Sequence, residues 1–262
     1  MAEEIKKLLA AFPKTRLPLT AAHEKIYAEE YQKTRGDDKP LTSKISAGIA
    51  GWMHRKVAAE KIEGEGETLE IGAGTLNHLP YENGGEYDII EPFTALFEHN
   101  PLQRTLRNIY QDIRDIPPGQ QYNRIISVAV LEHLTELPFA VARAGLLLKE
   151  DGMFQAGIPA EGGLLWGAAW RCSTGIAYRL RTKLDYKTLV RHEHVNTAKE
   201  IVAIARHFFG EVKLSYFPMP PIHVSLFVYI EARAPKKEIC SSFTTDYLAR
   251  NKDAVALAAT LA

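Results

Sequence analysis

Two apolar runs near the end of the chain constrain the fold most, because the link between them is short. The runs are 211–217 (EVKLSYF) and 223–232 (HVSLFVYIEA), and the link is 218–222 (PMPPI). A parallel crossover needs about a dozen residues or more. These two strands must therefore be antiparallel if they are neighbours in one sheet.

Short apolar runs before this pair alternate with segments of helical periodicity. They are 68–72 (TLEIG), 87–91 (YDIIE), 106–110 (LRNIY), 122–129 (YNRIISVA) and 153–159 (MFQAGIP). We expect the first four to be strands buried on both faces and joined by crossover helices. The sequence thus predicts an α/β fold: a Rossmann-like, seven-stranded, mostly parallel sheet with a C-terminal antiparallel hairpin and helices on both faces.

The remaining segments divide the chain into parts. Apolar spacing predicts helices at 2–11, 20–34 and 43–61, so that 1–60 is an N-terminal helical cap. Thr197 and Glu200 form a capping box that opens a further helix. We expect a single domain over 1–262, with a core at 68–159, an insertion at 160–195, the last helix and strands at 196–235, and a tail at 236–262.

Composition and charge exclude several classes of function. Lys plus Arg and Asp plus Glu are 32 each, so no summed positive field draws the chain to nucleic acid, and no nucleic-acid partner is expected. The most apolar stretch, 164–170, is too short to span a bilayer, and the first ten residues lack the apolar core of a signal peptide. Cys172 and Cys240 fit no zinc or redox spacing. We expect a cytoplasmic protein, monomeric or homodimeric, without membrane insertion.

A pair of glycines stands at the end of the first predicted strand. In 68–76 (TLEIGAGTL), Gly72 and Gly74 lie where only a residue without Cβ lets the backbone approach a ligand closely. Taken alone, they also fit an ordinary tight turn. Glu91 ends the second strand about 20 residues later, where a carboxylate can accept both ribose hydroxyls of an adenosine. Together these residues predict a cofactor that contains adenosine.

These motifs resemble those of class I S-adenosylmethionine-dependent methyltransferases. LEIGAGT (69–75) is similar to the family's first motif and DIIEP (88–92) to its second, while YNRIISVAVLEHL (122–134) is similar to the fourth. The resemblance covers 68–159, and over 195–232 it extends only to the order of strands and helices. It implies S-adenosylmethionine as the cofactor and S-adenosylhomocysteine as its product.

The resemblance also implies which residues hold the cofactor. Asp112 matches the acidic residue that the family places at the adenine amino group, with Ile113 beside the ring. The expected cofactor-binding residues are Glu70, Gly72, Ala73, Gly74, Glu91, Pro92, Asp112, Ile113, Ala129, Val130 and, from the cap, Tyr31. Two positions depart from the family: Leu76 replaces the third glycine, and Asn123 replaces an acidic residue. Loss of the third glycine disfavours a dinucleotide, whose diphosphate is normally cradled by a glycine-rich turn.

Two histidines are the candidates for catalysis. His133 lies just beyond the fourth strand, and its imidazole titrates near neutral pH, as a base for a hydroxyl acceptor should. The alternative is that His133 only packs against the cofactor, and Glu132 is expected to be a structural hydrogen-bonding partner. His194 ends the insertion. A metal at His192-Glu193-His194 is not expected, because residues two apart on a helix point to different sides and no third ligand stands nearby.

The expected methyl acceptor is a small molecule, covered by 1–60 and 160–195. Candidate substrate residues are Tyr27, Trp166, Arg171, Arg179, Tyr186 and His192. Aromatic rings can wall a pocket and arginines can grip a phosphate or carboxylate, although lid packing and solvated arginines explain them as well. LLWGAAWRCSTGI and EHVNTAKEI look similar to segments of methyltransferases in bacterial surface-polysaccharide pathways, which implies a sugar or phosphorylated intermediate.

Two other functions fit the same pattern. One is a nicotinamide-dependent reductase, disfavoured by the glycine motif and the terminal hairpin. The other is a non-catalytic scaffold or adenosine-cofactor-binding protein that keeps the fold.

Overall fold

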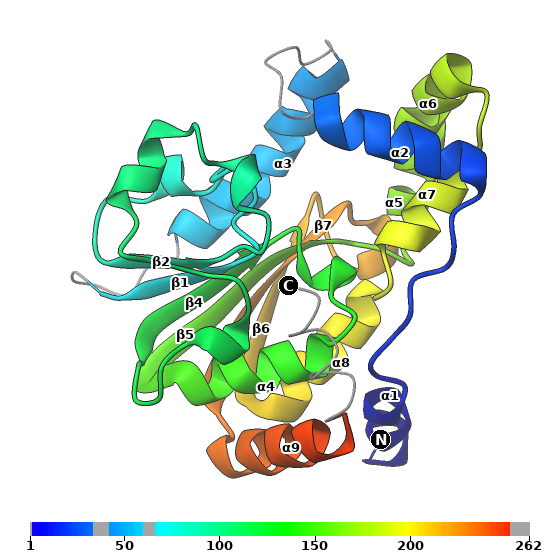
Figure 1. Ribbon diagram of the computed structural model, residues 1–262. Helices are drawn as coiled ribbons and strands as arrows, with labels where there is room; N and C mark the ends of the chain where they lie inside the picture. Colours follow the sequence, from blue (N-terminus) through cyan, green and yellow to red (C-terminus); the bar gives the residue numbers. More distant parts are fainter. Residues whose placement is uncertain (1, 34–41, 60–65, 252–262) are drawn as a thin grey trace.

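Seven strands form one sheet in the order β3-β2-β1-β4-β5-β7-β6 (Figure 1). The computed structural model describes residues 2–33, 42–59 and 66–251. β1 to β5 are parallel, and β7 is antiparallel to both of its neighbours, β5 and β6. The strands are β1 (Thr68–Ile71), β2 (Tyr87–Ile90), β3 (Asn108–Tyr110), β4 (Tyr122–Val128), β5 (Leu148–Pro159), β6 (Phe209–Phe217) and β7 (Phe227–Pro235). The predicted fold, including its terminal hairpin, is confirmed.

Nine helices are assigned in the described residues. They are α1 (Ala2–Ala10), α2 (Ala21–Lys33), α3 (Thr42–Ala59), α4 (Leu137–Leu147), α5 (Leu164–Cys172), α6 (Thr174–Thr182), α7 (Tyr186–Glu193), α8 (Ala198–Phe208) and α9 (Lys237–Arg250). The three N-terminal helices agree with the predicted ranges. The insertion, which showed little periodicity, consists of α5, α6 and α7. None of the helices in the described ranges is long and apolar enough to cross a membrane.

Alternating side chains of the strands bury two cores, one on each face of the sheet. On β4, Ile125 joins the core that contains α4, α8 and α9, whereas Ile126 joins the core that contains Met53 and Val57 of α3. Successive side chains of a strand point to opposite faces, so an unbroken apolar run is what a sheet covered on both faces requires.

Several capping and packing contacts fix the helices on this sheet. α8 begins with the expected capping box, in which the Thr197 hydroxyl accepts from the Glu200 backbone and the Glu200 carboxylate accepts from the Thr197 backbone. The tail forms α9, whose Tyr247 ring stacks on Phe139 of α4 with the ring centroids 5.2 Å apart. The Ala-rich stretch 254–262 lies outside the described residues.

Two local predictions were wrong. The connections between β1, β2, β3 and β4 contain short 3-10 turns, such as Leu79–Tyr81 and Pro101–Thr105, in place of crossover α-helices. Prolines and the 83–85 stretch (NGG) interrupt these connections. β3 is not buried on both faces either: it is the edge strand, and Asn108 and Ile109 are exposed.

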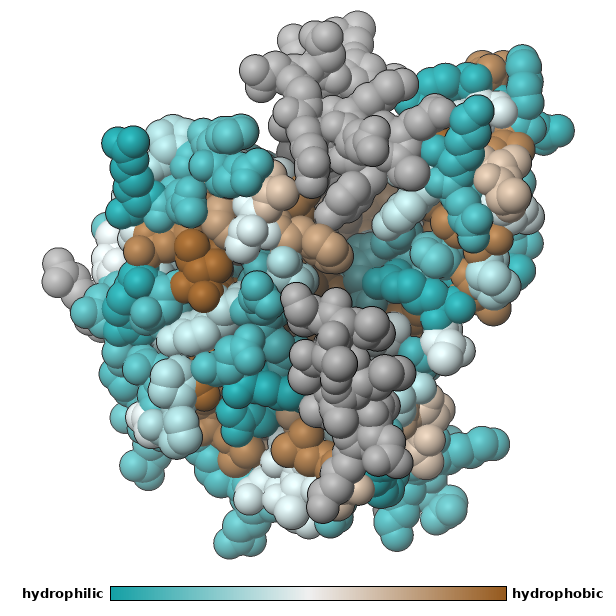
Figure 2. All heavy atoms as spheres, viewed as in Figure 1, coloured by the Kyte–Doolittle hydropathy of each residue, from teal (hydrophilic) through white to brown (hydrophobic). Residues whose placement is uncertain are grey.

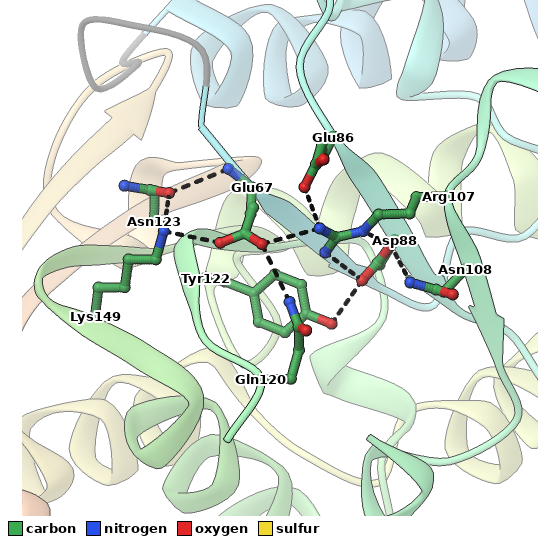
Figure 3. Close-up of polar contacts among 9 residues, drawn as sticks. All are labelled: Glu67, Glu86, Asp88, Arg107, Asn108, Gln120, Tyr122, Asn123 and Lys149. Atoms are coloured by element: carbon green, nitrogen blue, oxygen red, sulfur yellow. Dashed lines mark hydrogen bonds and ion pairs between the residues drawn. The ribbon is translucent and has the colours of Figure 1, made fainter. Parts of the chain in front are cut away.

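A polar network ties the amino ends of the strands together (Figure 3). The Arg107 guanidinium donates to both carboxylate oxygens of the fully buried Asp88 at 2.8 and 2.7 Å. Tyr122 donates to the same carboxylate at 2.8 Å, and Arg107 also pairs with Glu67 and Glu86. These contacts join the amino ends of β2, β3 and β4. The glycine turn lies at the opposite, carboxyl ends of the strands.

Candidate functional site

β1 ends in a turn whose two glycines both have left-handed backbones, with φ of 75° at Gly72 and 53° at Gly74. A Cβ atom at Gly72 would lie 2.5 Å from Cγ2 of Val130, closer than atoms can approach. Apart from its chain neighbours, a Cβ atom at Gly74 would meet no atom of the described residues within 4 Å. Gly72 is therefore required by the packing of the loop after β4, whereas Gly74 borders open space.

The carboxylate of Glu91 lies against this turn. The backbone N–H of Gly74 donates to Oε2 at 2.8 Å, and that of Phe93 donates to Oε1 at 3.0 Å. Glu91 ends β2, the neighbour of β1, and the parallel pairing brings the ends of both strands to one edge of the sheet. The glycine turn and the carboxylate meet at one place, as the sequence predicts.

A cavity of about 670 Å³ opens at this edge. The surface is hollowed between the part built on β1 to β3 and the part formed by α2, α6 and α7 (Figure 2). The residues of the cofactor prediction that line it are Glu70, Gly72, Ala73, Gly74, Glu91, Pro92, Asp112, Ile113, Ala129 and Val130. Tyr31 falls in α2, where its side chain lies outside the described residues. His133 lines the same cavity.

Asp112 and Ile113 follow β3 at the border of the cavity. Ile113 is buried, while Asp112 caps a 3-10 turn by accepting from the Arg114 backbone at 2.8 Å. The Asp112 carboxylate is also ion-paired with the Arg114 guanidinium at 2.9 Å, and its side chain is 46% exposed. The capping role fixes its orientation, and the exposed part of the carboxylate remains accessible from the cavity.

Glu70 is a buried carboxyl group that lines the cavity. It is 2% exposed and accepts a hydrogen bond from the Tyr87 hydroxyl at 2.9 Å. Burial raises the pKa of Glu70 to about 8, although the Tyr87 hydrogen bond opposes this shift. Glu70 is therefore mostly a neutral carboxylic acid at neutral pH.

A pair of histidines that the sequence analysis did not single out also lines the cavity. Nδ1 of His54, from α3, lies 3.1 Å from Nδ1 of His78, and Nε2 of His78 lies 2.6 Å from the Glu82 carboxylate. Burial, helped by His78 and Arg55, lowers the pKa of His54 to about 4. The two residues are 24 positions apart, with no motif to connect them.

His133, which lines the cavity, faces His194, which lines a neighbouring depression and not the cavity itself. Their rings meet edge to face with centroids 4.8 Å apart. Nδ1 of His133 lies 3.0 Å from the backbone oxygen of Glu193. Burial alone would lower the pKa of His133, but the Glu193 side chain and the nearby Glu132 carboxylate raise it. Burial also raises the pKa of Glu132, which is 2% exposed.

Solved structures with this strand arrangement include a SAM-dependent methyltransferase from Thermotoga maritima, described as a possible histamine N-methyltransferase. It matches with a TM-score of 0.53 and 15% sequence identity, over 81% of this chain and 97% of that one. 1,6-Didemethyltoxoflavin-N1-methyltransferase from Burkholderia thailandensis, with bound 1,6-didemethyltoxoflavin and S-adenosylhomocysteine, matches with a TM-score of 0.50 and 17% identity, over 84% of this chain and 93% of that one. The chain has the class I methyltransferase fold.

Other comparisons agree with this fold. An O-methyltransferase family protein from Burkholderia thailandensis matches with a TM-score of 0.51 and 11% identity, over 90% of this chain and 68% of that one. No family model matches the sequence, and no curated protein matches it significantly. The likeness is therefore one of fold and not of sequence.

The aromatic residues of the insertion form a row that begins at His194. Ring centroids are 5.7 Å apart for His194 and Trp166, 6.3 Å for Trp166 and Trp170, and 5.8 Å for Trp170 and Tyr186. Neither Trp166 nor Tyr186 lines the large cavity. In this methyltransferase fold, the row extends outward from the cavity border.

The other candidate substrate residues also lie outside the lining of the large cavity. Arg171 donates to the Gly167 backbone oxygen at 2.7 Å and stacks on Trp170, and Arg179 borders a small surface depression on α6. The Tyr27 ring contacts the His192 ring, with the centroids 5.9 Å apart. The predicted cofactor residues whose side chains are described thus line the cavity, and the candidate substrate residues do not.

Arg16 is a cavity residue that sequence reasoning missed. Its guanidinium donates to the backbone oxygens of His133 at 3.0 Å and of Glu193 at 3.0 Å. It thereby joins the segment between α1 and α2 to both the β4 loop and the end of α7. No local pattern in the sequence marks this role.

Proposed function

We propose that the chain is an S-adenosylmethionine-dependent methyltransferase that acts on a small molecule. The observation that carries the proposal is the contact of Gly74 with Glu91 at the border of one cavity. In open α/β sheets, ligands bind at the carboxyl ends of the strands, where this contact lies. A volume of about 670 Å³ is within the range of small-molecule and cofactor sites.

The residues around the cavity fit the groups of this cofactor. Each carboxylate oxygen of Glu91 accepts one backbone N–H and keeps a second acceptor position for a ribose hydroxyl. The open space beside Gly74 lets a ligand approach the backbone. Ile113 offers apolar surface to the adenine ring, and Asp112 offers an acceptor to its amino group.

The acceptor end of the cavity is assigned to His133, with His194 beside it. When bound, the cofactor supplies a methyl group on a positively charged sulfur, which is an excellent leaving group. The contribution of the chain is then mainly to hold the acceptor in line with that methyl group and to exclude water. Arg16, which joins the segments that carry both histidines, helps to close this end of the cavity.

We assign a small molecule, such as a sugar or a phosphorylated intermediate, as the acceptor. The Burkholderia thailandensis structure of similar fold holds a small molecule, 1,6-didemethyltoxoflavin, together with S-adenosylhomocysteine.

Replacement of Glu91 tests the cofactor assignment. Glu91→Ala should weaken binding of S-adenosylmethionine and S-adenosylhomocysteine by about 1–3 kcal/mol in calorimetric titrations, because two hydroxyls lose their acceptor. Glu98→Ala removes an exposed carboxylate outside the cavity and should leave the affinity unchanged. An affinity for Glu91→Ala equal to that of the wild type would reject the role of Glu91, and tight binding of NAD alone would reject the cofactor.

Enzymatic activity is separable from cofactor binding. Incubation of the chain with cofactor labelled at its methyl group and a metabolite extract should transfer label into a small molecule. Tight cofactor binding without transfer into any extract would favour a non-catalytic protein.

A further inference from the structure

Glu132 and His194 come together with His133, which lines the cavity, from two distant parts of the sequence. Glu132 and His133 belong to the 3-10 turn Leu131–His133 that follows β4, and His194 follows α7. One ligand atom from each residue lies within 4.8 Å of those of the other two. Two imidazoles and a carboxylate are a common donor set for divalent transition metals.

Glu132 carries the second, independent observation. Its side chain is almost fully buried, and among the described residues no donor lies within hydrogen-bonding distance of its Oε2. Its Oε1 lies 3.8 Å from Nε2 of His133. A buried carboxylate oxygen without a partner is unfavourable unless it is paired with a charge or coordinates a metal.

Both histidines are held as metal ligands usually are. Nδ1 of His133 is placed to donate to the Glu193 backbone oxygen, and Nδ1 of His194 is placed to donate to the Glu161 carboxylate. Histidines that bind a metal through one ring nitrogen normally donate the other N–H to a carbonyl or carboxylate, which fixes the tautomer and the ring orientation. In both rings Nε2 is the nitrogen left for a metal.

We propose that Glu132, His133 and His194 bind one divalent transition-metal cation at the acceptor end of the cavity. Two imidazole donors favour Zn²⁺ or Co²⁺ over Mg²⁺ and Ca²⁺, which prefer oxygen ligands. The side chain of His133 is 30% exposed and borders the cavity, so the cluster is accessible from it. The sequence argument against a metal concerned His192, Glu193 and His194 alone. The fold instead brings Glu132 and His133 to His194, and the Glu193 backbone oxygen orients the His133 ring.

The metal site follows from geometry alone, but its role in methyl transfer rests on the proposed function. A divalent cation lowers the pKa of a hydroxyl that reaches it. The site therefore favours oxygen as the methylated atom. In that case His133 would be a ligand and not the base, and the metal-bound hydroxyl would lose its proton to solvent before its oxygen takes the methyl group.

Calorimetry and absorption spectroscopy on the full chain test the site. After treatment with a chelator and dialysis, the protein should bind one equivalent of Zn²⁺ or Co²⁺, and Mg²⁺ more weakly by at least about tenfold. Bound Co²⁺ should show visible absorption bands typical of nitrogen and oxygen ligands. Absence of saturable Zn²⁺ and Co²⁺ binding to the wild-type chain would overturn the proposal.

Variants locate the ion at this cluster. Glu132→Gln, which keeps the side-chain volume, and His194→Ala should each abolish the stoichiometric binding, and Glu161→Gln should weaken it by about 10–100-fold. His99→Ala, which removes a histidine that is 95% exposed, is the matched control and should bind like the wild type. Binding that is unchanged in Glu132→Gln and His194→Ala would overturn the assignment.

Two further readouts keep the outcomes distinguishable. Circular dichroism checks that each variant is folded, and titration with S-adenosylhomocysteine reports on the cofactor end of the cavity. Stoichiometric metal binding without cofactor binding would support the site and contradict the proposed function. Cofactor binding without metal binding would support the proposed function and contradict the metal site.

Discussion

Gly72 and Gly74 share a left-handed backbone but differ in what surrounds them. An alanine at Gly74 would place its Cβ in open space at the cavity border, at a conformational cost of about 1–2 kcal/mol. At Gly72 the added Cβ would also have to displace Val130. A substitution at Gly74 therefore tests the approach of a ligand, and a substitution at Gly72 tests packing.

We predict that Gly74→Ala lowers the affinity for S-adenosylmethionine at least tenfold while the chain stays folded. Gly72→Ala should instead lower the free energy of unfolding by about 2–4 kcal/mol, because strain and overpacking add. Urea denaturation and calorimetric titration of both variants measure the two effects. Wild-type affinity in Gly74→Ala would show that no ligand approaches this part of the turn.

Glu70 predicts a pH dependence of stability. Its pKa is about 8 in the folded chain and 4.5 in the reference state, so the folded chain retains a proton that the unfolded chain has lost. This contribution to stability is fully present below pH 4.5, falls as pH rises, and is lost above pH 8. Glu70→Gln keeps a side-chain acceptor for Tyr87 and does not ionise.

The stability of Glu70→Gln relative to the wild type should therefore increase between pH 4.5 and 8, by no more than about 1.4 kcal/mol per pH unit. Urea denaturation of both proteins at several pH values gives this difference, in which the other titrating groups cancel. A difference that does not change with pH would mean that the Glu70 carboxyl has an ordinary pKa.

At the scale of elements, the network around Arg107 connects the amino ends of neighbouring strands (Figure 3). Arg107→Ala would leave the buried carboxylate of Asp88 with Tyr122 and Asn108 as its side-chain donors in the part of the chain that the structure describes. We predict that the free energy of unfolding falls by roughly 2–4 kcal/mol. Cofactor affinity should not change, because the candidate site lies at the carboxyl ends of the strands.

Urea denaturation and calorimetry measure both quantities. Lys149→Ala removes a more exposed partner of Glu67 and should change the stability by less than about 1 kcal/mol. Equal stability of Arg107→Ala and the wild type would mean that the network is not needed to compensate Asp88.

Elements with an unambiguous local pattern were predictable from sequence. The apolar runs gave the strands, and the short link 218–222 required the antiparallel pair of β6 and β7. The sequence predicted more burial for β3 than the structure shows. A short apolar run such as the one around Ile109 does not indicate whether its strand is central in the sheet or at its edge. The insertion was not predicted as helices. Some of its apolar residues are buried, others belong to the aromatic row, and others, such as Leu164 and Leu180, are exposed, so they do not follow a helical period.

At the scale of the molecule, the site combines predictable and unpredictable parts. Gly72, Gly74 and Glu91 end neighbouring strands, so strand order alone brings them together. The pairing of His54 with His78 and of His133 with His194 depends on how α3 and α7 pack on the sheet. No spacing in the sequence encodes those contacts, and for this reason the two histidine pairs could not be predicted from the sequence.

The central claim is that the glycine turn and Glu91 hold one adenosine. A crystal structure of the chain with S-adenosylhomocysteine tests it most directly. The account predicts the ribose hydroxyls at the carboxylate of Glu91, the backbone of Gly74 against the ligand, and the sulfur on the side of His133. S-adenosylhomocysteine bound elsewhere, or the cavity filled by protein side chains in that crystal, would contradict the account.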